Sequence, residues 1–134
     1  MLKRLLLKLW LQTWFYFISG IQVVIYFPFL VIILTLPKAY TKLFWIARNI
    51  WARITLHGSG YYVSVENKEK LESETNCLII ANHSSHMDVF LMLIANKKPF
   101  MFVGKKELYS IPLFGYIYKR AAIMVDRSDP KSRF

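Results

Sequence analysis

The distribution of apolar and polar positions begins with a long uncharged stretch near the amino terminus. Residues 9–37 carry no charged side chain, and Lys8 and Lys38 flank them. A helix that spans a bilayer needs about 20 apolar residues, so the stretch is long enough for one crossing and too short for an ordinary two-helix hairpin. A Ser-Gly pair and a proline inside it would permit a kink or a shallow re-entrant bend. The pattern predicts a membrane-embedded segment and leaves spanning and monotopic insertion open.

Residues 38–56 continue as an amphipathic segment with a helical period. The predicted apolar face consists of Leu43, Phe44, Ala47, Ile50, Trp51 and Ile54. Basic and amide side chains occupy the opposite face, and basic residues next to tryptophans suit a helix at the head-group level of a membrane. The alternative is an ordinary helix that faces the core of a soluble domain. Residues 1–56 are therefore expected to form membrane-embedded and interfacial helices.

Short apolar runs follow, separated by helical patterns. Four of these runs have the length of a strand: 61–65, 77–81, 100–103 and 121–125. Apolar residues recur at helical spacing between the last three runs, and Pro112 divides the second helical region into two short helices. Buried strands that alternate with helices indicate a mostly parallel sheet with right-handed crossovers. We predict an α/β fold: a partial, mostly parallel sheet with flanking helices in residues 57–134, preceded by the membrane-associated helices.

The net charge and its distribution along the chain indicate which class of molecule the protein binds. The chain of 134 residues has a formal net charge of +10, and residues 1–60 contain seven basic side chains and no acidic one. Basic residues among tryptophans, beside a long apolar stretch, indicate an anionic lipid surface. Nucleic acid is not expected, because no basic stripe occurs away from the apolar sequence. Basic residues are slightly more numerous after the uncharged stretch than before it, which favours a cytoplasmic location for the remaining domain.

His83 and Asp88 carry the chemical hypothesis. His83 follows the predicted strand 77–81, and open α/β sheets bind ligands at the carboxyl ends of their strands. Residues five apart diverge on a continuous helix, so the two side chains meet only if His83 lies in the turn and Asp88 in the first helical turn. Ser85 would then be the N-cap and Asp88 the N3 acid of a capping box. An oriented His–Asp pair can activate a substrate hydroxyl as a general base; the alternative is a helix cap beside an ordinary turn histidine.

Three basic residues follow the ends of two other predicted strands. Lys105 and Lys106 come after the run at 100–103, and Arg127 comes after the run at 121–125. In a parallel sheet these ends share one edge with His83, so the cations could bind a phosphate group of a substrate. The alternative for the two lysines is a solvated position at a helix start, where the helix dipole slightly disfavours them.

A metal site is not expected from the same region. Its candidate ligands would be Cys77, His83, His86 and Asp88. Cys77 falls inside a predicted buried strand, and the spacing matches no common zinc pattern. It is also the single cysteine of the chain, so no disulfide framework is indicated.

The motif Asn82-His-Ser-Ser-His-Met-Asp88 resembles the NHx4D signature of the glycerolipid acyltransferases, the family of 1-acylglycerol-3-phosphate acyltransferases. That family's second block is similar to Gly104-Lys-Lys-Glu-Leu108, Ile111-Pro-Leu-Phe-Gly115 and Ala122-Ile-Met-Val-Asp-Arg127, in the expected order. The resemblance covers roughly residues 77–127. It identifies residues 57–134 as the amino-terminal half of an acyltransferase α/β domain.

The resemblance implies roles for four residues. His83 would deprotonate the free hydroxyl of a lysophosphatidic acid-like acceptor, and Asp88 would orient His83. The hydroxyl would attack the thioester of acyl-CoA or acyl-carrier protein, which is a co-substrate, so no cofactor is expected. Lys105 and Arg127 would help to hold the acceptor phosphate. The implied activity is that of a 1-acylglycerol-3-phosphate O-acyltransferase in phospholipid synthesis at a membrane.

Family members continue into a third block, a Glu-Gly-Thr-Arg motif that this sequence does not contain. We therefore expect the 134 residues to be a fragment of a longer protein, because the predicted sheet would otherwise keep an unpaired edge and an incomplete core. The alternative is a truncated, non-catalytic remnant of such an enzyme that still binds membranes.

Overall fold

The computed structural model describes residues 2–67, 69, 77–82 and 85–126. The chain forms two compact units. The first unit contains Met1–Gln22 and Phe44–Lys98, and the second contains Val23–Leu43 and Pro99–Phe134. The start of the NHx4D helix therefore belongs to the first unit, and the second motif block belongs to the second.

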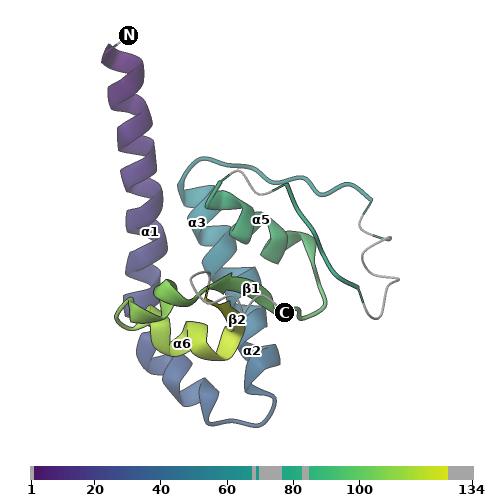
Figure 1. The fold of residues 1–134 in the computed structure, drawn as a ribbon. Coiled ribbons are helices and arrows are strands. Elements are labelled where there is room, and N and C mark those ends of the chain that lie inside the picture. The colour runs from purple at the N-terminus through teal and green to yellow at the C-terminus, as the bar shows by residue number, and fades with distance from the viewer. Residues whose placement is uncertain (1, 68, 70–76, 83–84, 127–134) are drawn as a thin grey trace. The chain divides into compact units, whose positions relative to one another are not determined.

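The uncharged stretch forms one long helix, α1, which runs from Leu2 to Leu34 (Figure 1). Pro28 lies inside it without ending it. By length and composition its segment Lys3–Leu34 could cross a membrane, and most of its side chains are exposed. The predicted long apolar helix is confirmed, whereas its insertion into a membrane stays a prediction.

The predicted helix over 38–56 is also confirmed, although it consists of three parts. These are α2 (Ala39–Ile46), the π-helical turn η1 (Ala47–Trp51) and α3 (Ala52–Gly58). A π turn holds more residues than an α-helical turn, because its hydrogen bonds run from i to i+5. The turn therefore changes which positions face the core after it.

The π turn makes the predicted apolar face wrong in its second half. Ile54 was expected to face inward but is 45% exposed. Ala52, Thr55 and Leu56 are buried instead, each with no exposed surface. The extra residue in the turn moves the buried face about one position along the sequence, which a uniform 3.6-residue period cannot predict.

Phe90 is the centre of the apolar core in the first unit. It lies on α5 (Met87–Ala95), which packs against α3 (Figure 1). The ring centroids of Trp51 and Phe90 are 4.6 Å apart. The ring of Phe15 in α1 meets the Phe90 ring edge-on, with the two centroids 5.3 Å apart. The predicted helix after the NHx4D motif is thus confirmed, and its apolar side is covered from α1 and the π turn.

Polar side chains also join α1 to the helices beside it. The Nε2 group of Gln22 donates to Thr55 Oγ1 at 2.9 Å, and both side chains are buried. The indole N–H of Trp14 in α1 donates to the carbonyl of Gly58 in α3 at 3.0 Å. The indole N–H of Trp51 in the π turn donates to the carbonyl of Ser19 in α1 at 3.1 Å. Because a buried donor without a partner is costly, the Gln22–Thr55 bond holds α1 against α3, and the two indole bonds add contacts along residues 14–22.

Two of the four predicted strands do not form. Residues 61–65 and 77–81 have no strand hydrogen bonding, and Cys77, Leu78 and Ile80 are exposed. A strand needs a neighbouring backbone for its hydrogen bonds, and no described segment supplies one to either run. The prediction of a buried strand before the NHx4D motif is wrong, because this apolar run has no strand partner among the described residues and is not buried.

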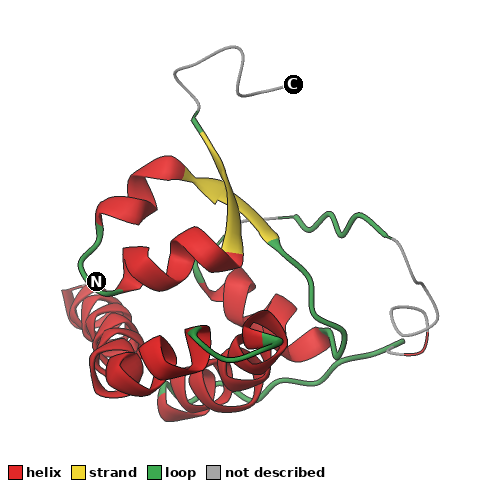
Figure 2. Cartoon of the chain, turned by 90° about the horizontal axis from the view of Figure 1, so that it is seen from below, coloured by secondary structure: helices red, strands yellow, loops and turns green. Residues whose placement is uncertain are grey.

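The other two predicted strands form a parallel pair in the second unit, although the run expected at 100–103 forms its strand two residues later. Neither strand is buried on both faces as expected, because Val103 and Ile123 are 64% and 53% exposed. The two strands are β1 (Phe102–Lys105) and β2 (Ala122–Val125), which lie side by side in Figure 2. Phe102 is opposite Ala122, and Lys105 is opposite Val125. The fold class is confirmed in this part: a parallel pair joined by helices, within an otherwise helical chain.

The crossover between the strands contains the 3-10 helix η2 (Lys106–Ser110) and the helix α6 (Phe114–Ala121), so the predicted division near Pro112 is confirmed. Two glycines of the second motif block make its close contacts. A Cβ atom on Gly104 would collide with the hydroxyl of Tyr118, and one on Gly115 would collide with the carbonyl of Tyr109. Gly104 therefore lets α6 approach β1, and Gly115 lets α6 approach the 3-10 helix.

Candidate active site

The start of α5 is held by reciprocal bonds between Ser85 and Asp88. The backbone N–H of Ser85 donates to Asp88 Oδ2 at 2.8 Å, and the N–H of Asp88 donates to the Ser85 carbonyl at 3.2 Å. The Ser85 hydroxyl accepts from the N–H of Met87 at 3.2 Å. These bonds are of the predicted capping-box type, but the helix begins one residue later than predicted: its N-cap is His86, which itself makes no side-chain cap bond. The carboxylate thus sits in the first turn, where the helix dipole favours negative charge.

His83 lies outside the described residues, so its contact with Asp88 stays a prediction. The structure does establish where its proposed partner is. Asp88 is in the first turn of α5, half-buried, and its carboxylate is oriented by the Ser85 N–H. A carboxylate held in this way keeps one orientation, which a residue that aligns a general base requires.

The second histidine of the motif contacts the amino-terminal helix. Tyr16 of α1 and Nδ1 of His86 are hydrogen bonded at 3.0 Å, and their rings meet edge-on at 5.8 Å. Both side chains are exposed. Because the adjacent Phe15 contacts Phe90, two successive residues of α1 touch both the start and the middle of α5.

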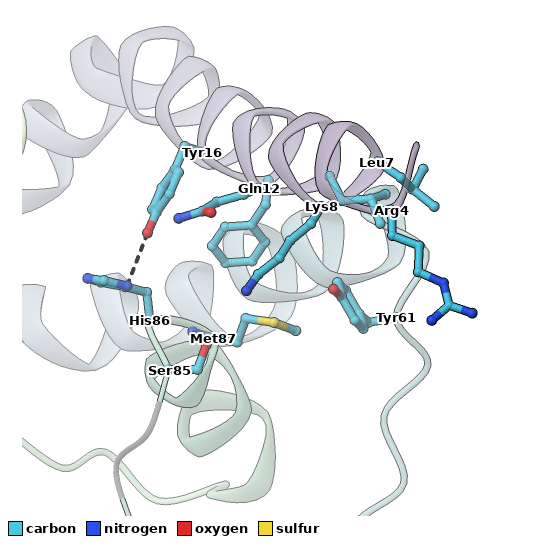
Figure 3. Close-up of a pocket in the computed structure, with 11 residues that line it drawn as sticks. Arg4, Leu7, Lys8, Gln12, Tyr16, Tyr61, Ser85, His86 and Met87 are labelled. Atoms are coloured by element: carbon cyan, nitrogen blue, oxygen red, sulfur yellow. Dashed lines mark hydrogen bonds between the residues drawn. The ribbon is translucent and has the colours of Figure 1, made fainter. Parts of the chain in front are cut away.

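An open cleft of about 610 Å³ lies between α1 and the start of α5 (Figure 3). Seven residues of α1 line it: Arg4, Leu7, Lys8, Leu11, Gln12, Phe15 and Tyr16. The opposite wall is formed by Tyr61, Ser85, His86 and Met87. The cleft therefore borders the residues that cap α5, and its wall combines cationic, hydroxyl and apolar groups.

The contribution of α1 to this cleft was not predicted from the sequence. Arg4, Lys8, Gln12 and Tyr16 recur at every fourth position, and residues at this spacing share one face of a helix. Figure 3 shows all four on the side of α1 that faces the cleft. A polar stripe that begins before the uncharged stretch and continues into it was the available signal, because a helix surrounded by lipid would have no use for it.

The predicted phosphate-binding cations belong to the second unit. Lys105 ends β1 and is exposed, and Arg127 lies outside the described residues. Lys106 pairs with Asp126 at 3.1 Å, with the two side chains 63% and 29% exposed. Such a surface pair contributes at most about 1 kcal/mol. The argument that these cations share a sheet edge with His83 fails, because the strand expected at 77–81 is not formed; their roles stay predictions.

The hydroxyl of Tyr118 fastens α6 to the end of β1. It donates to the carbonyl of Lys105 at 3.2 Å. Burial raises the pKa of this hydroxyl, and the negative charge of Glu107 raises it further. The hydroxyl therefore stays protonated and remains a donor across the physiological range.

The described residues offer no cluster of three or more histidine, cysteine or acidic side chains that could hold a metal ion. His86 bonds to Tyr16, and Cys77 is exposed on the extended segment. What the site presents is a fixed carboxylate at a helix start, beside an open cleft with two basic side chains.

Comparison with known proteins identifies the family. The acyltransferase family model matches residues 62–133, which include the NHx4D motif, α5 and the parallel strands. A lysophosphatidylcholine acyltransferase of Drosophila melanogaster is 38% identical over 77 residues, which are 57% of this chain and 14% of that protein. A 1-acyl-sn-glycerol-3-phosphate acyltransferase of Cocos nucifera is 32% identical over 85 residues, 63% of this chain and 27% of the relative.

The chain thus spans only 14% and 27% of the lengths of these two relatives. No solved structure matches it. The family match nevertheless covers more than half of the chain, and both relatives agree with the resemblance seen in the sequence motifs. The chain belongs to the acyltransferase family, within its glycerolipid acyltransferases.

Proposed function

We propose that this protein moves a fatty acyl group from a thioester donor to the free hydroxyl of a lysophosphatidic acid-like acceptor. The observation that carries the proposal is the family match over residues 62–133, which contain both motif blocks. One relative is named for lysophosphatidylcholine and the other for 1-acyl-sn-glycerol-3-phosphate. Each of these lipids is a glycerophospholipid with a single acyl chain, so a single-chain acceptor is the common expectation.

In the proposed reaction the imidazole of His83 takes the proton of the acceptor hydroxyl as its oxygen attacks the thioester carbonyl carbon. A carbon–oxygen bond forms, the carbon–sulfur bond breaks, and the proton passes from His83 to the departing thiolate. Asp88 would orient the imidazole and stabilise its protonated form. The Ser85 N–H supports this role, because it holds the Asp88 carboxylate in one orientation at the helix start.

The acceptor resides in a bilayer, so the mode of membrane contact is part of the proposal. If α1 crossed the bilayer, residues 14–22 would lie in the hydrocarbon together with α3 and α5, which contact them. That position would immerse Arg53 and Asp88, and each ionised group at the bilayer centre costs about 3 kcal/mol or more. The contacts favour α1 lying along the membrane, with its exposed apolar side toward lipid. The slight excess of basic residues after the uncharged stretch supports the cytoplasmic side for the catalytic part.

A donor–acceptor screen tests the proposed activity. Protein expressed from its complete reading frame and reconstituted in vesicles should transfer acyl groups from acyl-CoA or acyl-carrier protein to lysophosphatidic acid. Loss of the general base in His83→Ala should lower the rate by about 100-fold to 10,000-fold, while vesicle binding persists.

Full activity in His83→Ala would remove His83 as the base. Vesicle binding without turnover on any acceptor would instead identify a non-catalytic membrane-binding protein.

A further inference from the structure

The cleft between α1 and α5 carries positive charge without negative charge. Arg4 and Lys8 line it one helical turn apart, and no acidic residue is among those that line it. Within the part of the chain that the structure describes, neither cation has a carboxylate partner. A guanidinium and an ammonium group so close together are a common way to bind a phosphate: the first binds two oxygens, and the second acts as a point charge.

The cleft is also elongated along α1. Arg4 and Tyr16 are twelve positions apart in the sequence, which corresponds to about 18 Å of helix. Figure 3 shows the ammonium group of Lys8 pointing from α1 toward Ser85 and Met87. Tyr16 marks the other end by its hydrogen bond to His86 in the NHx4D motif. The cleft therefore leads from a cationic end to the candidate active site.

Apolar groups line the same cleft and cover the reverse side of the helix. Leu11 and Met87 belong to its wall. Leu6, Trp10 and Phe17 lie about 160–180° around α1 from Lys8 and are 56%, 65% and 58% exposed. An apolar face of this size is suited to contact with lipid. The cleft would then open beside the membrane from which a lipid ligand comes.

We infer that this cleft binds an anionic single-chain phospholipid, with its phosphate at Arg4 and Lys8 and its acyl chain along Leu11 and Met87. The identity of this lipid as an acceptor rests on the proposed function. The charge of the cleft selects between the two lipids for which the relatives are named. A choline group is a cation and would be repelled by Arg4 and Lys8, whereas a phosphate monoester carries only negative charge.

Equilibrium binding of a short-chain lysophosphatidic acid to the chain in neutral detergent tests the inference. Lys8→Gln and Arg4→Gln should each weaken binding by about tenfold or more, because each removes a charge-assisted bond to phosphate. Lys3→Gln is the matched control. It removes the same charge from the same end of α1, but Lys3 does not line the cleft, so affinity should change by less than about twofold. Arg4→Lys should recover part of the loss.

Three results would overturn the inference. Equal losses in all three glutamine variants would show general attraction to a basic surface. Weakened binding in Lys105→Gln alone would place the phosphate in the second unit. Coenzyme A or lysophosphatidylcholine binding with the same affinity, and with the same loss in Lys8→Gln, would show that the cleft does not select an anionic single-chain lipid.

The test is independent of turnover. A protein that binds lysophosphatidic acid through Arg4 and Lys8 but transfers no acyl group would contradict the proposed activity and leave the binding site in place. If the protein transfers acyl groups but the Arg4→Gln and Lys8→Gln variants bind lysophosphatidic acid as tightly as the wild type, the proposed activity is supported and the proposed binding site is contradicted.

Discussion

Gly104 and Tyr118 explain part of the second motif block through packing. The tyrosine hydroxyl lies where a side chain at position 104 would begin, and it donates to the carbonyl of Lys105. A Cβ atom on Gly115 would likewise collide with the carbonyl oxygen of Tyr109. At position 115 the obstacle is backbone, so glycine is required there, whereas at position 104 a side chain would have to displace the end of the Tyr118 side chain. The motif therefore contains residues that shape the strand end as well as candidate phosphate ligands such as Lys105.

This packing predicts non-additive effects of substitution. Gly104→Ala should lower the free energy of unfolding by about 1–3 kcal/mol, because the new methyl group collides with the Tyr118 hydroxyl. Tyr118→Phe should cost about 1 kcal/mol through loss of the bond to the Lys105 carbonyl. In the double variant the collision is largely relieved, so its cost should be clearly smaller than the sum.

Denaturant unfolding followed by circular dichroism measures this coupling. Additive costs would show that the hydroxyl and position 104 do not contact each other.

Individual helices and strands were predictable to different degrees. The helices at 38–56 and after the NHx4D motif were predicted correctly, because their periodicity is local. The parallel pair at β1 and β2 was also predicted from two apolar runs around a helical region. The run at 77–81 has the same appearance but no strand partner among the described residues. Strand pairing is non-local, and the π turn leaves no composition signal, so neither could be read from the sequence.

The packing of α1 predicts its orientation at the membrane. A helix that lies along the surface keeps both of its ends on one side of the bilayer, whereas a crossing helix separates them. In sealed vesicles, a cysteine introduced as Lys3→Cys should therefore react with a membrane-impermeant maleimide from the same side as the exposed native Cys77. Each site is labelled separately, with Cys77→Ser as the background for the first.

Labelling of the two cysteines from opposite sides would contradict this orientation and establish a crossing. The contacts of residues 14–22 with α3 would then require rearrangement on insertion.

The two compact units divide the candidate chemistry between them. The first unit holds Asp88, its serine cap and the cleft along α1, and the second holds Lys105 and the parallel strands. The motifs predicted the family and the capping of α5 from sequence alone. The cleft was not predicted, because it arises when α1 packs on α5, although its polar stripe was visible at every fourth position. His83 and Arg127 lie outside the described residues, so their roles rest on the family motifs.

The central claim is that Asp88 serves chemistry in addition to helix capping, and Asp88→Asn separates these roles. An asparagine oxygen can still accept from the Ser85 N–H, so α5 should keep its cap and the protein its helix content. The charge that would orient and stabilise His83 is lost, so the rate of acyl transfer to lysophosphatidic acid, measured on protein from the complete reading frame, should fall by about 100-fold or more. Wild-type turnover in a correctly folded Asp88→Asn protein would contradict the account.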